Sequence, residues 1–132
     1  MKHNFILIDK VSHDVCNKLV RYFNNNKDSL AYRGMTAKGV TNSKKSLDIA
    51  IDFTNDNEPF LQYKRELQKC LDKYMKIYPE TYRMDRYQMC ENYNIQHYEP
   101  GEGFKDWHFE RGSINDSKRV LVFMTYLTNT KN

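Results

Sequence analysis

The chain has 132 residues, of which 39% are hydrophobic and 14% aromatic, a composition typical of a folded globular domain and not of a disordered chain. Its formal net charge of +4 comes from scattered basic residues, with no dense basic run beyond Lys44 and Lys45, which disfavours a nucleic-acid binder. No apolar stretch reaches membrane-spanning length, and the one near the N-terminus is too short for a signal peptide. We therefore expect a single domain over residues 1–132 without a nucleic-acid or membrane partner.

The three cysteines, Cys16, Cys70 and Cys90, lie far apart in the chain, and no pair has the C-x-x-C spacing. An odd count argues against a closed disulfide framework. Cys16 and Cys70 fall on the apolar faces of predicted helices, so we expect buried thiols. Free thiols are typical of a reducing compartment, and a cytoplasmic location is the corresponding prediction.

The N-terminal half of the chain, residues 1–86, is predicted to be mainly helical. Residues 5–8 are predicted to form a short strand, and Ser12 is a plausible N-cap for a first helix that ends at the three asparagines 24–26. The apolar residues of this helix recur at helical spacing: Val15, Cys16, Leu19, Val20 and Phe23.

A loop, a strand and a longer helix follow. Residues 31–46 are polar and contain two glycines, which predicts a mobile loop, and residues 47–53 alternate as a half-buried strand does. Asn57 is a good cap for the longest helix, which Pro79 ends. Its apolar stripe is interpreted as core and not as a cofactor site: Phe60, Tyr63, Leu67, Cys70, Leu71 and Tyr74.

The C-terminal half, residues 87–132, changes to a strand pattern. Residues 93–98 alternate, and residues 119–127 are apolar on both faces, which predicts a strand buried on both sides. A helical half followed by a strand-rich half indicates an α+β domain with helices packed on one side of a sheet.

His108 and Glu110 are the candidate metal ligands. Residues i and i+2 of a strand point to the same face, and an imidazole and a carboxylate are two of the three ligands of the facial triad that binds iron(II) in oxygenases. A bare H-x-E motif is common by chance, but this one follows a turn-rich approach, residues 98–104. No histidine follows His108; the three that precede it, His3, His13 and His97, are interpreted as solvated or sheet residues.

These residues resemble the iron(II)/2-oxoglutarate-dependent oxygenases, in particular the prolyl 4-hydroxylase-like branch. The family pattern is a tyrosine, a glycine-containing turn, an H-x-D motif, a gap, and an apolar strand that ends in Tyr-Leu-Asn. Here the pattern runs from Tyr98 through residues 99–103 to His108 and Glu110, and on to a strand that ends in the sequence YLTN. The resemblance extends over nearly the whole chain.

The resemblance implies a double-stranded β-helix, or jelly roll, with supporting N-terminal helices. His108 and Glu110 would bind iron(II), Tyr98 and Tyr126 would line the 2-oxoglutarate pocket, and Met124 would form an apolar wall of that pocket. The implied activity is that of a dioxygenase that hydroxylates a peptidyl proline or a related aliphatic C–H, with ascorbate as reductant. A protein or peptide substrate would be the partner.

The chain departs from the family pattern at two points. Glu110 stands where the family usually has aspartate, and its additional methylene moves the carboxylate outward by about an ångström. The family's second histidine, and the basic residue that binds the distal carboxylate of 2-oxoglutarate, would lie beyond Asn132. We therefore expect a jelly roll that is incomplete at its C-terminus, with an open sheet that a second copy or a complementing chain would cover.

Three other functions compete with the oxygenase. A non-catalytic binding or interaction module on the same fold, with a degenerate or incomplete metal site, is the main alternative, since the third ligand is missing. A zinc hydrolase ranks lower because the chain has no H-E-x-x-H motif. A nucleic-acid binder ranks last because the net charge is small and undirected.

Overall fold

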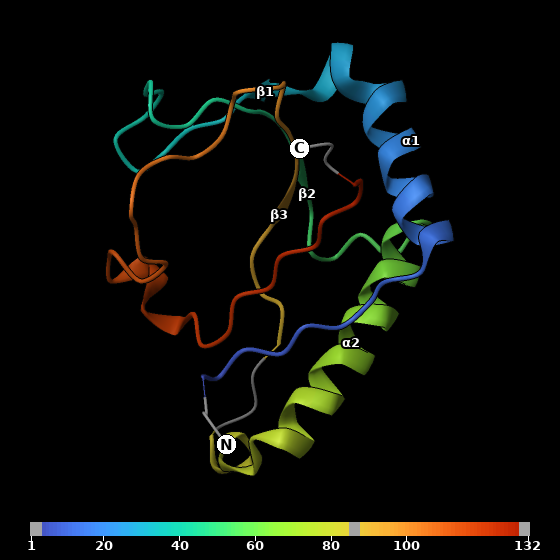
Figure 1. Ribbon diagram of the computed structural model, residues 1–132, viewed down its shortest axis with the longest axis vertical. Helices are drawn as coiled ribbons and strands as arrows, with labels where there is room; N and C mark the ends of the chain where they lie inside the picture. The colour runs from blue at the N-terminus through green and yellow to red at the C-terminus, as the bar shows by residue number, and fades with distance from the viewer. Residues whose placement is uncertain (1–3, 85–87, 130–132) are drawn as a thin grey trace. The chain divides into compact units, whose positions relative to one another are not determined.

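The computed structural model describes residues 4–84 and 88–129 of the chain. The elements along it are α1 (His13–Leu30), β1 (Tyr32–Arg33), β2 (Leu47–Ile51), α2 (Phe60–Ile77), the 3-10 helix η1 (Pro79–Arg83), β3 (Tyr93–His97) and the 3-10 helix η2 (Asn115–Lys118) (Figure 1). The chain forms two compact units: the first contains residues 1–21, 54–90 and 125–132, and the second contains residues 22–53 and 91–124. No helix in the described ranges is long and apolar enough to cross a membrane.

In the first unit, the start of α1 is held by a carboxylate of α2. The backbone N–H and the hydroxyl of Ser12 donate to the two carboxylate oxygens of Glu66, over 2.6 and 2.7 Å, and the hydroxyl accepts a bond of 3.4 Å from the N–H of Val15. Ser12 is therefore the N-cap that the sequence predicts, because its hydroxyl satisfies one of the free N–H groups of the first turn. The part played by Glu66 could not be read from the local sequence.

Burial confirms the apolar face of α1 and part of that of α2, in which Leu67, Cys70, Leu71 and Tyr74 are only half-buried. Helix α1 buries Val15, Cys16, Leu19 and Phe23, and α2 buries Phe60 and Tyr63. Helix α1 continues to Leu30, however, and does not end at residues 24–26. The side-chain amide of Asn26 donates to the carbonyl of Tyr22 over 2.8 Å, so this asparagine bonds within the helix that it was expected to end. Asn57 makes no side-chain cap; its carbonyl accepts the N–H of Phe60.

All three cysteines are free thiols, as the odd count predicts. Cys16 is buried, Cys70 is partly buried and Cys90 is exposed. Burial is the main cause that raises the pKa of the Cys16 and Cys70 thiols above the ordinary value.

Tyr63 of α2 joins the C-terminal segment to the core of the first unit. Its hydroxyl shares a hydrogen bond of 2.8 Å with the hydroxyl of Thr125. Burial raises the pKa of Tyr63, and this effect outweighs the opposing effect of the hydrogen bond to Thr125. The phenol is thus kept neutral in the folded chain.

This burial predicts an alkaline loss of stability. A phenol whose pKa is raised by folding contributes stability that is fully present below its unfolded pKa of about 10 and is lost as the pH rises through the folded value. The free energy of unfolding, measured in urea, should therefore fall more steeply above pH 10 for the unmodified chain than for Tyr63→Phe, which cannot ionise at this position. If the free energy of unfolding falls equally with pH in the two proteins, burial of the neutral Tyr63 phenol is not the cause of the alkaline loss.

The second unit is built on an antiparallel sheet in the order β1-β2-β3 (Figure 1). In the register of β2 and β3, Ile49 lies opposite Ile95, and both side chains are buried. Phe23, in the part of α1 that belongs to this unit, is also buried, and its ring lies 5.6 Å from that of His97. The half-buried strand predicted at residues 47–53 is confirmed, although it ends at Ile51.

The unit also buries charge. Lys44 and Asp48 form an ion pair of 3.0 Å, with 9% and 1% of their side chains exposed. Gln96 of β3 donates to the same oxygen of Asp48 over 3.0 Å. The loop expected at residues 31–46 is therefore anchored at its end, and β1 lies within it.

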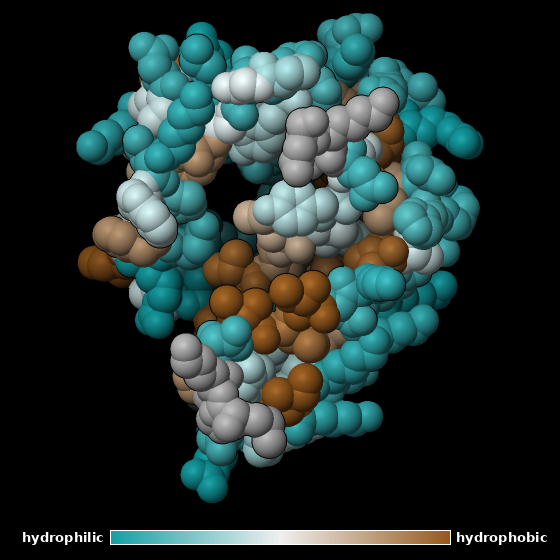
Figure 2. Space-filling view, in the orientation of Figure 1, coloured by the Kyte–Doolittle hydropathy of each residue, from teal (hydrophilic) through white to brown (hydrophobic). Residues whose placement is uncertain are grey.

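Three strands predicted from the sequence are absent from the described residues, and those predictions are wrong. Residues 5–8, residues 105–110, where the sequence analysis placed the H-x-E motif on a strand, and residues 119–127 form no strand there, although the N–H of Lys105 donates to the carbonyl of Ser43. The last segment keeps most of its apolar side chains at the surface, from 38% exposed for Leu121 to 82% for Tyr126, whereas Leu127 is half-buried. Hydrophobic side chains are visible on the face shown in Figure 2. Apolar residues on both faces show that a segment is suited to burial on both sides, but a strand also needs a neighbour to share its backbone hydrogen bonds. The three strands described form a small open sheet, and the jelly roll remains a prediction.

Gly34 tests the packing around the buried ion pair. A Cβ atom added at Gly34 would lie 2.1 Å from Oγ of Ser46 and 3.1 Å from Oδ1 of Asp48. We expect Gly34→Ala to lower the free energy of unfolding by about 1–3 kcal/mol, as overpacking of a core does. Gly103→Ala is the matched control, since nothing lies within 4 Å of its added Cβ. Equal unfolding midpoints in urea for the two variants would contradict the described packing.

Candidate metal site

A tight turn leads the chain from β3 to His108. The N–H of Glu102 donates to the carbonyl of Glu99 over 2.9 Å, and Gly101 has a φ of +84°, which favours glycine. Residues 103–105 then pair with residues 43–45, with Lys44 opposite Phe104. The glycine-containing turn before the H-x-E motif, expected from the sequence, is confirmed.

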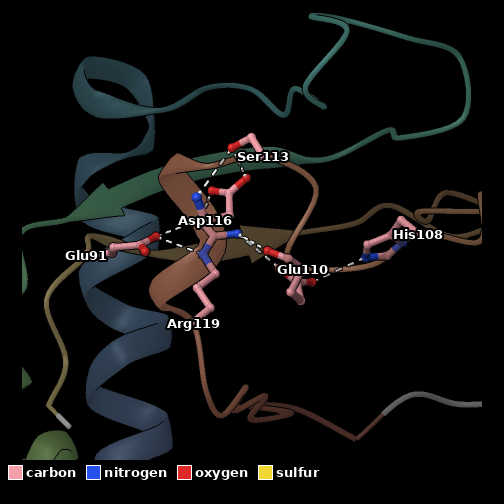
Figure 3. Close-up of polar contacts among 6 residues, drawn as sticks. All are labelled: Glu91, His108, Glu110, Ser113, Asp116 and Arg119. Carbon is pink, nitrogen blue, oxygen red and sulfur yellow. Dashed lines mark hydrogen bonds and ion pairs between the residues drawn. The ribbon is translucent and has the colours of Figure 1, made fainter.

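His108 and Glu110 point toward one another (Figure 3). Nε2 of His108 lies 3.5 Å from Oε1 of Glu110, and 46% and 44% of the two side chains are exposed. The segment is not a strand, so this convergence does not come from strand alternation. The proximity that the motif predicts is nevertheless present.

The other ring nitrogen of His108 fixes the tautomer. Nδ1 lies 3.0 Å from the carbonyl oxygen of Asp106. A carbonyl can only accept, so Nδ1 must carry the proton, and in the neutral ring Nε2 then presents a lone pair to the carboxylate of Glu110. The ring of Phe104 stacks on that of His108, with centroids 4.1 Å apart and an interplanar angle of 19°. The imidazole is thus held at one edge and over one face.

Arg119 holds the carboxylate of Glu110 from its other side (Figure 3). Nη1 donates to the carbonyl of Glu110 over 3.0 Å and lies 3.4 Å from its Oε2. The same guanidinium donates to Glu91 over 2.6 and 3.0 Å and lies 3.3 Å from Asp116. The hydrogen bond to Glu91 is the main cause that raises the pKa of Arg119, which remains charged. Three carboxylates share one cation, so the region has a local excess of negative charge.

His108 and Glu110 would offer two ligands to a small cation placed between them. Two ligands at right angles, each about 2.1 Å from one metal ion, lie about 3 Å apart, so a separation of 3.5 Å needs an adjustment of about half an ångström. A backbone carbonyl bonded to the second ring nitrogen is the usual support of a metal-binding histidine. Residues 4–84 and 88–129 contain no group of three or more His, Cys, Asp or Glu side chains that could hold a metal. His108 and Glu110 would therefore supply two ligands, and the described residues supply no third.

Among the described residues, no contact joins the side chains expected around 2-oxoglutarate to this pair. Tyr98 is half-buried, and its hydroxyl donates to Gln96 over 3.2 Å. Met124 is 75% exposed, and Tyr126, in the other compact unit, is 82% exposed. The 2-oxoglutarate pocket therefore remains a prediction.

The remaining histidines do not join the pair within the described residues. His97 is half exposed, with Nδ1 3.8 Å from a carboxylate oxygen of Glu99, and His13 is an exposed residue at the start of α1. His3 lies outside the described residues. Arg119 and Phe104 are the site residues that sequence reasoning did not identify as neighbours of the H-x-E motif, because their contacts depend on the folding of the intervening loops.

Comparison with protein-family models, with curated proteins and with solved structures gave no match to this chain.

Arg119 should stabilise the second unit. Arg119→Met would leave Glu91, Glu110 and Asp116 without their shared cation, and we expect the free energy of unfolding to fall by about 1–2 kcal/mol at low ionic strength. The loss should shrink in high salt, which screens partly exposed charges. Arg111→Met removes a nearby exposed arginine and is the control. Equal, salt-independent effects of the two substitutions would contradict this role.

Proposed function

We propose that this chain is an iron(II)- and 2-oxoglutarate-dependent dioxygenase of the prolyl 4-hydroxylase-like branch, in which His108 and Glu110 are two of the iron ligands. The observation that supports it is the approach of His108 Nε2 to within 3.5 Å of a carboxylate oxygen of Glu110, while Nδ1 of the same ring lies 3.0 Å from the carbonyl oxygen of Asp106. Two acceptors that face one another repel unless a proton or a metal ion lies between them. A metal ion satisfies both, and imidazole with carboxylate is a donor set that suits iron(II).

The chain's own residues would prepare this site in three ways. Asp106 holds the proton of His108 on Nδ1, so that Nε2 is free to bind. Arg119 directs one oxygen of Glu110 toward the histidine, because it engages the other oxygen. Phe104 covers one face of the imidazole and excludes water from it.

The chemistry would be that of the resembling family. When bound, iron(II) with 2-oxoglutarate would supply the oxidation of an aliphatic C–H, with a peptidyl proline as the leading substrate class and ascorbate as reductant. The third protein ligand would come from a histidine outside the described residues, from a second copy or from a complementing chain. The apolar surface at residues 120–126 is consistent with such a complement.

A non-catalytic binding module is the second candidate, and one observation favours it. The carboxylate of Glu110 already has a cationic partner in Arg119, at 3.4 Å. In a degenerate site, this ion pair and a protonated His108 would satisfy the carboxylate without any metal. The two candidates differ in whether His108 binds a divalent ion.

Metal titration separates the two candidates. We expect anaerobic calorimetry with iron(II) at pH 7.5 to show weak binding that falls at least about tenfold in His108→Ala, since a ligand is lost. His13→Ala, which removes an exposed histidine of α1, should bind as the unmodified chain does. Binding should also weaken at lower pH, because protons compete for Nε2. Equal affinities for His108→Ala and the unmodified chain would favour the non-catalytic module.

Turnover by this chain alone is expected to be absent. Two protein ligands hold iron weakly, and the basic residue that binds the distal carboxylate of 2-oxoglutarate in the family has no counterpart assigned here. The measurement is succinate formation with iron(II), 2-oxoglutarate, ascorbate and a proline-rich peptide. Steady succinate formation that His108→Ala abolishes would show instead that the site is complete without a further histidine.

A further inference from the structure

The ion pair between Lys44 and Asp48 lies inside the unit that carries the candidate metal site. Its two atoms are 3.0 Å apart, and the side chains are 9% and 1% exposed. Gln96 of β3 donates to the same Asp48 oxygen over 3.0 Å, so the pair is bound to two adjacent strands. Burying two charges removes them from water, and a well-packed apolar pair of similar size is often at least as stable. A role other than stability is therefore worth seeking.

The backbone around Lys44 is hydrogen-bonded to the segment before His108. The N–H of Lys45 donates to the carbonyl of Gly103 over 3.0 Å, and the N–H of Lys105 donates to the carbonyl of Ser43 over 2.8 Å. These two bonds place Phe104 opposite Lys44. The ammonium of Lys44 lies 5.9 Å from the centroid of the Phe104 ring, within the range of a cation–π contact.

Phe104, which contacts Lys44, also contacts His108. Its ring stacks on the imidazole of His108 at 4.1 Å and 19°. The carbonyl of Asp106 fixes the Nδ1 edge of the same ring, 3.0 Å away. Rotation of the imidazole would break the stack and the hydrogen bond together, and would turn Nε2 away from Glu110.

We infer that Lys44 and Asp48 are positioning residues for His108: the buried ion pair fixes Phe104, and Phe104 fixes the plane of the imidazole. Neither residue touches the metal position itself. The inference rests on the proposed function for its purpose, since an oriented Nε2 matters for a metal ligand. The orientation itself is a property of the metal-free chain and can be measured there.

The test is the NMR signature of His108 in the metal-free chain, with labelled histidine and His108→Gln to assign its signals among the four histidines. Ring protons that lie over an aromatic face are shifted upfield, so we expect upfield signals that Phe104→Leu removes and Phe104→Tyr keeps. Lys44→Met should return the His108 signals most of the way to the Phe104→Leu position. Lys44→Arg, which keeps a cation beside Asp48, should restore them.

Two controls separate positioning from loss of fold. Lys45→Met removes the exposed neighbouring lysine and should leave the signals unchanged. Lys44→Met combined with Asp48→Asn removes both charges together, so that no unpaired carboxylate is left buried; it should still release the imidazole, while the signals of the buried Ile49 and Ile95 stay in place. If His108 keeps its upfield signals in both Lys44→Met and the double variant, the inference is overturned.

The outcome is independent of metal binding. If the unmodified chain binds no iron(II) but Lys44→Met releases the imidazole, the positioning role stands and the proposed function fails. If iron(II) binds and the imidazole signals do not respond to Lys44 or Phe104, the positioning role fails and the proposed function stands. If both hold, Lys44→Met should also weaken iron(II) binding severalfold, with Lys45→Met unchanged.

Discussion

A lysine and an aspartate that neutralise one another inside the second unit set the geometry of much that surrounds them. Asp48 sits on the central strand of the sheet, where it also receives the amide of Gln96 from β3. Ser46, Lys44 and Asp48 together leave no room for a side chain at position 34, where an added Cβ would lie 2.1 Å from Oγ of Ser46. The backbone around Lys44 pairs with the segment that leads to His108, so hydrogen bonds link the neighbourhood of the buried ion pair to the candidate site.

Apolar spacing was enough to predict the two helices and the two longer strands, since burial of a repeating face is encoded locally. It could not predict the ion pair. Asp48 falls between apolar residues of an alternating strand, where a polar side chain is expected to face water, and Lys44 belongs to a stretch that resembles a solvated loop. The Glu66 partner of Ser12 is equally remote in sequence. Contacts of this kind depend on which segments meet, and a single sequence does not show that.

The sequence led us to expect that His108 approaches Glu110, but the strand expected to carry both residues is absent from the described residues. His108 and Glu110 do converge, but on an irregular segment held by side chains and not on a strand. The stack with Phe104 orients His108 and the bonds of Arg119 orient Glu110, whereas strand alternation was expected to orient both. The apolar residues 119–127 behave likewise: their pattern indicates a buried strand, and burial requires neighbours that the described residues do not supply.

The three thiols differ enough in environment to be told apart by chemistry. The thiolate is the reactive form, and burial raises the pKa of Cys16 and Cys70, whereas Cys90 is exposed. A maleimide dye added in small excess would therefore attach first at Cys90. That position immediately precedes Glu91, whose carboxylate accepts hydrogen bonds from Arg119. The emission of a polarity-sensitive dye at Cys90 would therefore respond to loss of the ion pair between Arg119 and Glu91.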